Sequence, residues 1–237
     1  MKFKSLIPKL DLKGPNLIKS MYLEGLRVLG KPEEFSEHYF KAGCDELIIH
    51  DAVAQLLDKV ISLDVVKKIS QKVFIPITVG GGIRSINDIK KILHSGASKI
   101  SINSYALKKP DFINHAANIF GSSVVSVSID VGKINNGYNV FAVNGRECFG
   151  KDPVDWAKEI EERGAGEILL TCIQSEGSGE GYNIELVKKV SDAVNIRVIP
   201  NGGAGCLEHI LELFKRTNVD AASLSSMLHY SLLYKYK

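Results

Sequence analysis

Ile75-Pro-Ile-Thr-Val-Gly-Gly-Gly-Ile83 decides the fold of this chain, because a weaker copy recurs at Ile196-Arg-Val-Ile-Pro-Asn-Gly-Gly-Ala-Gly205. Each copy is a short run of apolar, largely β-branched residues that ends in glycines, which predicts a buried strand followed by a loop. Glycines in such a loop leave backbone N–H groups open to an anion, and the start of the following helix adds its dipole. The two copies together predict a repeated architecture with two anion sites.

The repeat continues outside the glycine loops at nearly the same spacing. The matched segments are 45–51 with 166–172, 80–82 with 202–204, 98–104 with 220–226, and Leu10-Asp11 with Ile129-Asp130. Agreement at four places predicts an internal duplication. We therefore expect one domain made of two fused half-barrels, at about 1–121 and 122–237, with four βα units in each.

Strand-like and helix-like segments alternate along the whole chain. The predicted strands are 5–12, 46–51, 75–79, 99–102, 124–131, 167–171, 197–201 and 221–224. The predicted helices are 32–42, 62–72, 86–95, 110–120, 153–163, 184–194 and 207–216. This order favours an α/β fold of the (β/α)8 TIM barrel type. A doubly wound sheet is the alternative, but it accounts less well for the repeat.

Composition and charge exclude several classes of protein. The 237 residues are 45% hydrophobic and 24% charged, with a net charge of +3. Lysines and glutamates are mixed along the chain, which argues against a nucleic-acid surface but suits a small anionic substrate. The four cysteines and six histidines lack metal-ligand spacing, so we expect reduced thiols, no metal and no cofactor. No long apolar run or signal-peptide core is evident, which predicts a cytoplasmic protein without membrane contact.

Two connections are irregular. Residues 13–31 are too long for a simple link between a strand and a helix, and long loops at this end of a barrel usually act as lids. Residues 134–138 contain an Asn-Gly turn signal, which predicts a small hairpin with residues 139–143.

Asp11 and Asp130 end the first and fifth predicted strands, which lie opposite each other in an eight-stranded ring. Active sites of such barrels lie at the carboxyl ends of the strands. Two carboxylates that face each other there can divide the acid and base roles if their surroundings separate their pKa values. Their symmetric placement favours this role over simple capping of the following segments.

Loops of each half provide candidate donors for an anion. The first cradle would consist of Gly81, Gly82, Asn103 and Ser104, and the second of Gly177, Gly202, Gly203, Ser225 and Ser226. Backbone N–H groups and hydroxyls are suitable donors to phosphate. Two anion sites across one mouth predict a long substrate that is phosphorylated at both ends, with its reactive middle between the aspartates.

The chain resembles the histidine-biosynthesis barrel family nearly from end to end, and within it the cyclase subunits of imidazole glycerol phosphate synthase. The family also contains an aminoaldose–aminoketose isomerase. The resemblance is carried by the segments 10–13, 45–47, 79–83, 99–103, 128–130, 164–171 and 202–205, and by Glu208-His209. The run Gly164-Ala-Gly-Glu-Ile-Leu-Leu-Thr171 is especially specific.

The resemblance implies roles for particular residues. Asp11 and Asp130 would be the acid–base pair, and Lys19 would be the lysine of the lid. Thr171 and Glu176 would lie in the substrate and phosphate site. Ammonia from a partner glutaminase, bound at the N-terminal face of the barrel, would react with a bis-phosphorylated ribulosyl aminoimidazole carboxamide.

Further family residues concern the entry of ammonia. Glu46, Lys99 and Glu167 match three of the four charged residues that gate it at the barrel bottom.

Some positions depart from the family pattern. The fourth gate position is Ser5 where an arginine is usual, Glu176 replaces an aspartate, and Asn201 replaces a serine. Strand parity places Lys9 and His50 inside the barrel beneath Asp11, where they would fill part of the ammonia path and shift the pKa of that carboxyl.

These departures leave three alternatives to the synthase subunit. One is a paralogue that aminates or amidinates a nucleotide sugar for surface glycans. Another is the related isomerase, which needs no ammonia gate. The third is a non-catalytic subunit that only supports a glutaminase.

Overall fold

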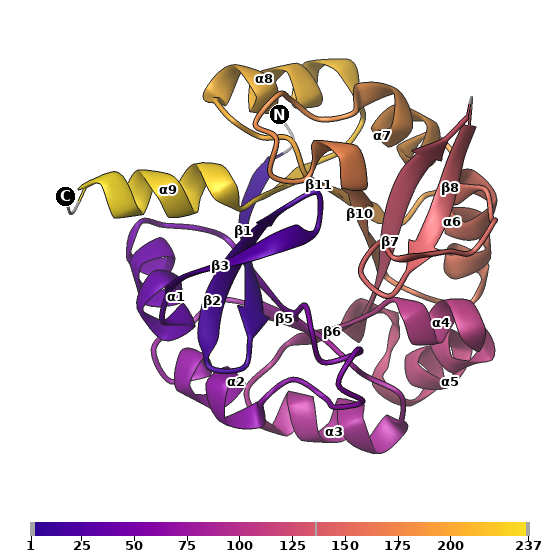
Figure 1. Ribbon diagram of the computed structural model, residues 1–237. Coiled ribbons are helices and arrows are strands. Elements are labelled where there is room, and N and C mark those ends of the chain that lie inside the picture. Colours follow the sequence, from indigo (N-terminus) through magenta and orange to yellow (C-terminus); the bar gives the residue numbers. More distant parts are fainter. Residues whose placement is uncertain (1–2, 136, 236–237) are drawn as a thin grey trace.

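The computed structural model describes residues 3–135 and 137–235, and within them eight parallel strands form a ring that is surrounded by helices (Figure 1). The ring strands are β1 (Ser5–Lys13), β4 (Leu47–Asp51), β5 (Ile77–Gly80), β6 (Lys99–Ile102), β7 (Val125–Ile134), β10 (Glu167–Cys172), β11 (Arg197–Asn201) and β12 (Ala221–Leu224). Because a helix or helical turn follows each strand, the chain is a (β/α)8 barrel, as the alternating pattern predicted.

The strand order shows that the sheet closes on itself. Hydrogen-bonded neighbours follow the path β11-β10-β7-β6-β5-β4-β1, and β12 pairs with the other side of β1. Strands β11 and β12 lie side by side and complete the ring. An open doubly wound sheet would leave its outer strands unpaired on one side, so this alternative is wrong.

Helices cover the outside of the ring. They are α1 (Pro32–Lys41), α2 (Leu63–Ser70), α3 (Ile86–His94), α4 (Ser104–Lys108), α5 (Asp111–Phe120), α6 (Pro153–Glu162), α7 (Ile184–Ser191), α8 (Leu207–Arg216) and α9 (Ser226–Lys235), with short 3-10 turns at Ser122–Val124 and Ile173–Ser175. Local sequence begins several of them: at α3, for example, Ser85 and Asp88 form a reciprocal capping box. None of the described helices is long and apolar enough to cross a membrane.

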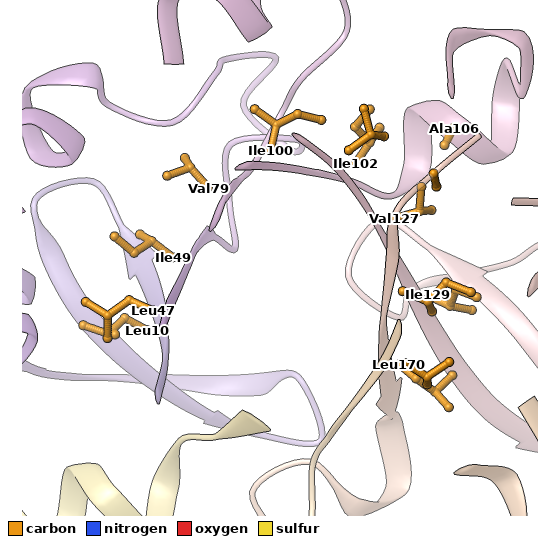
Figure 2. Close-up of a cluster of buried hydrophobic side chains, with 14 of the residues drawn as sticks. Leu10, Leu47, Ile49, Val79, Ile100, Ile102, Ala106, Val127, Ile129 and Leu170 are labelled. Carbon is orange, nitrogen blue, oxygen red and sulfur yellow. The ribbon is translucent and has the colours of Figure 1, made fainter. Parts of the chain in front are cut away.

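The main core lies between the strands and the helices. Figure 2 shows part of it, with Leu10, Ile49, Ile100 and Ile129 arranged around the ring of strands. Residues of the opposite parity point into the barrel, where Ile7, Ile48, Leu169, Ile199 and Ala221 form a separate apolar cluster. This inner cluster divides a charged layer at the N-terminal ends of the strands from a polar layer at their carboxyl ends.

Two hairpins extend the ring. Residues 13–31 contain β2 (Asn16–Met21) and β3 (Glu24–Gly30), which form an antiparallel hairpin joined to β1. In Figure 1 this hairpin crosses the mouth of the barrel, as expected for a lid.

The second hairpin is formed by β7 and β8 (Gly137–Ala142), with the two-residue strand β9 (Glu147–Cys148) at its edge. It was also predicted, but Asn136 of its turn lies outside the described residues. Because β7 forms one strand of this hairpin, it ends three residues beyond its predicted end.

Sheet register corrects the alignment of the two glycine loops by one residue. His50 lies level with Gly80, and Thr171 lies level with Asn201. Since 45–51 corresponds to 166–172, Gly80 corresponds to Asn201 rather than to Gly202. Gly81 and Gly82 then match Gly202 and Gly203, and all four have positive φ angles. The half-barrel division itself stays a prediction.

Replacing Gly203 is expected to destabilise the barrel strongly. Its φ is +108°, and a Cβ atom there would overlap the carbonyl oxygen of Gly181. We expect Gly203→Ala to lower the free energy of unfolding by about 3 kcal/mol. The control is Gly150→Ala, at φ +72° with open space around the added atom, which should cost only about 1 kcal/mol. Urea unfolding measures both, and equal losses would show that the close approach to Gly181 does not matter.

Candidate active site

Asp11 and Asp130 lie in one cavity at the carboxyl ends of β1 and β7. The cavity of about 80 Å³ is also lined by Lys9, His50 and Thr171. Both aspartates are 7% exposed, so they are largely withdrawn from water. The cavity reaches down to the level of Lys9 and His50, which confirms that these two side chains point into the barrel.

Asp11 is surrounded by cations. The Lys9 ammonium forms an ion pair with its Oδ1 atom, and Lys19 Nζ lies 4.0 Å from Oδ2. Burial alone would raise the pKa of Asp11, but the charges of Lys9 and Lys19 outweigh it and lower that pKa below its ordinary value. The carboxyl of Asp11 is therefore held as a carboxylate at neutral pH.

Asp130 has the opposite environment. Burial raises its pKa to about 6, although Lys9 and a hydrogen bond from Asn103 oppose the shift. Asn103 Nδ2 donates to Asp130 Oδ2 at 2.8 Å. Two carboxyl groups in one cavity thus have separated pKa values, which is the arrangement that assigns different proton-transfer roles.

His50 is a neutral neighbour of the pair. Burial and the positive charge of Lys9 lower the pKa of His50 to about 3. Its Nε2 atom is buried and has no protein partner among the described residues. A neutral imidazole beside Lys9 adds a polar atom to the cavity without adding charge.

The first predicted cradle opens into this cavity. Gly81, Gly82, Asn103 and Ser104 all line it. Ser104 Oγ accepts a hydrogen bond from the Val143 N–H at 2.9 Å, so its own O–H is free to donate. The amide of Asn103 donates to Asp130 instead, which ties the first cradle to the acid–base pair.

The second predicted cradle is a separate and much smaller hollow. It is lined by the five residues assigned to it from the sequence, Gly177, Gly202, Gly203, Ser225 and Ser226, together with Glu176, Asn201 and others. The hollow encloses about 10 Å³, roughly the room of one water molecule. A phosphate can enter only if a neighbouring side chain moves.

Glu176 is the acidic side chain that lines the second cradle. Its carboxylate pairs with the buried Lys19 ammonium and accepts from Asn201 Nδ2 at 3.1 Å. Asn201 also donates to Thr171 Oγ1 at 3.2 Å. The Tyr22 N–H donates to the Glu176 carbonyl at 2.8 Å, so main chain and side chain both hold the β2–β3 lid against this loop.

Charged residues close the opposite end of the barrel. Lys99 Nζ lies 2.7 Å from Glu167 Oε2 and 3.2 Å from Glu46 Oε2, which joins the three residues predicted for this place. Arg197 completes the network: its Nη1 lies 2.6 Å from Glu46 Oε1 and 3.8 Å from Glu167 Oε2. In this chain β11 thus provides a guanidinium at the barrel bottom, where the family pattern has the arginine at the position of Ser5.

Sequence reasoning missed Arg197, although a signal was present. Arg197 begins the strand that ends at Asn201, and both have the parity of the inward residue Ile199. Counting by twos along that strand would have placed its guanidinium at the barrel bottom. Ser5 has the same parity on β1 as Lys9 and Asp11.

An eight-stranded barrel whose carboxyl groups have separated pKa values, beside loops rich in anion donors, is typical of an acid–base enzyme that acts on a small anionic substrate. The chain belongs to the histidine biosynthesis protein family, whose model matches residues 5–233.

Two relatives show how close this membership is. An imidazole glycerol phosphate synthase subunit HisF of Clostridium botulinum (strain Langeland) is 44% identical over 232 residues, which cover 97% of this chain and 92% of the relative. A subunit HisF of Legionella pneumophila is 51% identical over 204 residues, 86% of this chain and 96% of the relative. The family resemblance inferred from the motifs is therefore confirmed.

Proposed function

We propose that the protein is the cyclase subunit of imidazole glycerol phosphate synthase in histidine biosynthesis. It would use ammonia to convert a bis-phosphorylated ribulosyl aminoimidazole carboxamide into imidazole glycerol phosphate and aminoimidazole carboxamide ribotide. The observation that carries the proposal is the shared cavity of Asp11 and Asp130, whose pKa values are shifted in opposite directions. The names of the relatives agree with it.

The two carboxyl groups would act in turn. Asp11 is ionised at neutral pH, so it can accept a proton from the nitrogen that attacks the substrate. Asp130 retains a proton to higher pH, so it can donate that proton to the departing amine. Asn103, which is bonded to Asp130, would fix the direction in which the proton is delivered.

The phosphates would bind at the ends of the mouth. Gly81, Gly82 and Ser104 surround the first, and Gly202, Gly203, Ser225 and Ser226 the second. Lys19 would release Glu176 and turn to the substrate when the lid rearranges, since the second cradle must widen to admit a phosphate. Thr171 and Gly177 would support the substrate and the lid.

Ammonia would come from a partner glutaminase subunit at the N-terminal face. Glu46, Lys99, Glu167 and Arg197 form the charged network on the barrel axis there. Loops that precede the strands lie on this face, and Phe3 and Phe74 belong to them with exposures of 97% and 78%. Such exposed aromatic side chains are typical anchors of a protein interface.

A direct assay tests the proposal. Purified protein is mixed with an ammonium salt and the bis-phosphorylated substrate, and loss of the substrate is followed. Turnover that the folded Asp130→Asn variant lacks supports the proposal. A folded wild-type protein without turnover at millimolar substrate and ammonium overturns it.

The pH profile of the ammonia-dependent reaction is a further prediction. Because burial raises the pKa of Asp130 to about 6, the protonated acid becomes scarce above that pH. We expect kcat/KM, calculated per unit of free-base ammonia, to fall about tenfold per pH unit above pH 6. An Asp130→Glu variant should show the same decline in kcat/KM, but it should begin at a different pH, because the pKa of the glutamate differs from that of Asp130. A rate that rises through pH 6 would instead make Asp130 the base.

One observation favours a second candidate. The Glu176 carboxylate lines the second cradle and brings a negative charge to it, which suits a substrate that lacks a second phosphate. A paralogue that aminates or amidinates a nucleotide sugar would be such a protein. Glutamine-dependent amination of a nucleotide sugar, together with no loss of the bis-phosphate, would favour this candidate.

A further inference from the structure

Three buried side chains behind the second cradle form a chain of hydrogen bonds. Tyr39 Oη on α1 lies 2.6 Å from His229 Nδ1 on α9, and His229 Nε2 lies 3.2 Å from Ser225 Oγ. His229 is fully buried and Tyr39 is 5% exposed. The inner end of this chain is Ser225, which lines the second cradle.

Packing holds the His229 ring in one orientation. The ring stacks on Tyr39 with 5.8 Å between centroids and 24° between planes. Phe35 meets it edge-on at 5.7 Å and 88°. Since the ring cannot turn without disturbing α1, Nδ1 stays directed at Tyr39 and Nε2 at Ser225, and the backbone carbonyl of Lys9 is a further acceptor near the ring.

The tyrosine determines which nitrogen carries the proton. Among the described residues, His229 Nδ1 is the sole side-chain hydrogen-bond partner of the Tyr39 hydroxyl. A buried O–H left without an acceptor is costly, so Tyr39 donates and Nδ1 accepts. Burial lowers the pKa of His229 to about 3, so the ring is neutral and its one proton lies on Nε2.

That proton then orients the serine. Nε2–H donates to Ser225 Oγ, so the serine oxygen acts as an acceptor toward His229 and its own O–H is left to donate elsewhere. The open direction is the cradle, where Gly202, Gly203 and Ser226 also lie. In the other tautomer, Ser225 would donate to His229 and present only lone pairs to the cradle, which an anion avoids.

We propose that Tyr39 and His229 are positioning residues that fix the Ser225 hydroxyl as a donor to an anion in the second cradle. The inference deepens the proposed function and rests on its assignment of this cradle to the second phosphate. Neither residue lines the cavity or the second cradle, so their effect should be on binding and should pass through Ser225.

A double-mutant cycle on binding tests this. Inorganic phosphate is titrated by calorimetry into wild type, His229→Leu, Ser225→Ala and the double variant. We expect His229→Leu to weaken binding of phosphate in the second cradle about five- to tenfold, the value of one neutral hydrogen bond. In the Ser225→Ala background the same change should have no further effect. Equal effects in both backgrounds would overturn the proposal, as would wild type that binds no phosphate in this cradle.

Matched variants separate positioning from structure. The side-chain amide introduced by His229→Gln can place an N–H near Ser225 and should recover part of the affinity, while Tyr39→Phe should weaken binding two- to threefold. Ser104→Ala removes a hydroxyl of the first cradle, and its effect should simply add to that of His229→Leu. Urea midpoints check that each variant folds. If the coupling between Ser104 and His229 were as large as that between Ser225 and His229, His229→Leu would act through a general structural change, and the proposal would be wrong.

Turnover then distinguishes this inference from the proposed function. If the bis-phosphate is converted, His229→Leu should raise its KM five- to tenfold and leave kcat nearly unchanged. A fall in kcat at constant KM would overturn the positioning role and leave the cyclase assignment standing. If Ser225 and His229 are coupled in phosphate binding but the bis-phosphate is not converted, the positioning role stands and the cyclase assignment is overturned.

Discussion

Asp130→Asn is expected to remove a factor of about 10²–10⁴ from the ammonia-dependent rate and, at the same time, to make the protein more stable at pH 8. The loss of rate follows because an amide cannot donate the proton that the carboxylic acid holds. The gain in stability follows because the buried carboxylate is costly. Burial raises the pKa of Asp130 from 3.8 to about 6, so the folded protein binds this proton more tightly than the unfolded chain does.

The sign of the pH effect is therefore fixed. Between about pH 4 and pH 6 the folded state keeps the proton and the unfolded state has lost it, so stability falls as the pH rises through this window. The total loss in the free energy of unfolding is on the order of 3 kcal/mol, and it is complete above pH 6. An asparagine carries no charge at any pH, so the variant should lack this particular decline.

Urea unfolding at pH 4, 6 and 8, run on wild type and Asp130→Asn, measures the difference. We expect the two free energies to be similar at pH 4 and to separate in favour of the variant at pH 8. Asn103→Ala is a useful control, because it removes the hydrogen bond to Asp130 but keeps the carboxyl group. A variant less stable than wild type at pH 8 would show that the Asp130 carboxylate is well solvated or well paired, against its environment in the barrel.

Strand parity explains how much of the site could be predicted. Lys9 and Asp11 are two residues apart on one strand, so an inward Asp11 required an inward Lys9, and the structure joins the two side chains in an ion pair. The glycine loops were also evident from the sequence. Their glycines are needed because Gly81 and Gly202 have positive φ angles, which most other residues avoid. In each case a constraint within one short segment of sequence was sufficient to predict the feature.

Contacts between distant segments could not be obtained in this way. Lys19 and Glu176 are 157 residues apart, and their pairing depends on how the lid folds over the mouth. Tyr39 and His229 are 190 residues apart on helices that meet only in the closed ring. Local periodicity says which face a side chain occupies but not which partner it meets there.

Asp11→Asn is expected to remove activity and stability together, in contrast to Asp130→Asn. The asparagine cannot accept a proton, so the ammonia-dependent rate should again fall about 10²–10⁴-fold. It also leaves the Lys9 ammonium buried without its counter-charge, and Lys9 is only 4% exposed. Breaking one side of a buried ion pair costs about 3–5 kcal/mol, so urea unfolding should show a loss of this size.

The double variant Lys9→Met/Asp11→Asn separates the two effects. Methionine has nearly the volume of the lysine stem and carries no charge, so the double variant should recover most of the lost stability, since a buried pair replaced by neutral groups is often close to neutral. The rate should stay low, because stability is restored without restoring the base. If the rate returned with the stability, Asp11 would be a structural counter-charge for Lys9 and the proton-transfer role would have to lie elsewhere. If Asp11→Asn alone were as stable as wild type, Lys9 would have a second partner, for which Asp130 and Glu176 are the acidic groups whose charges act on it.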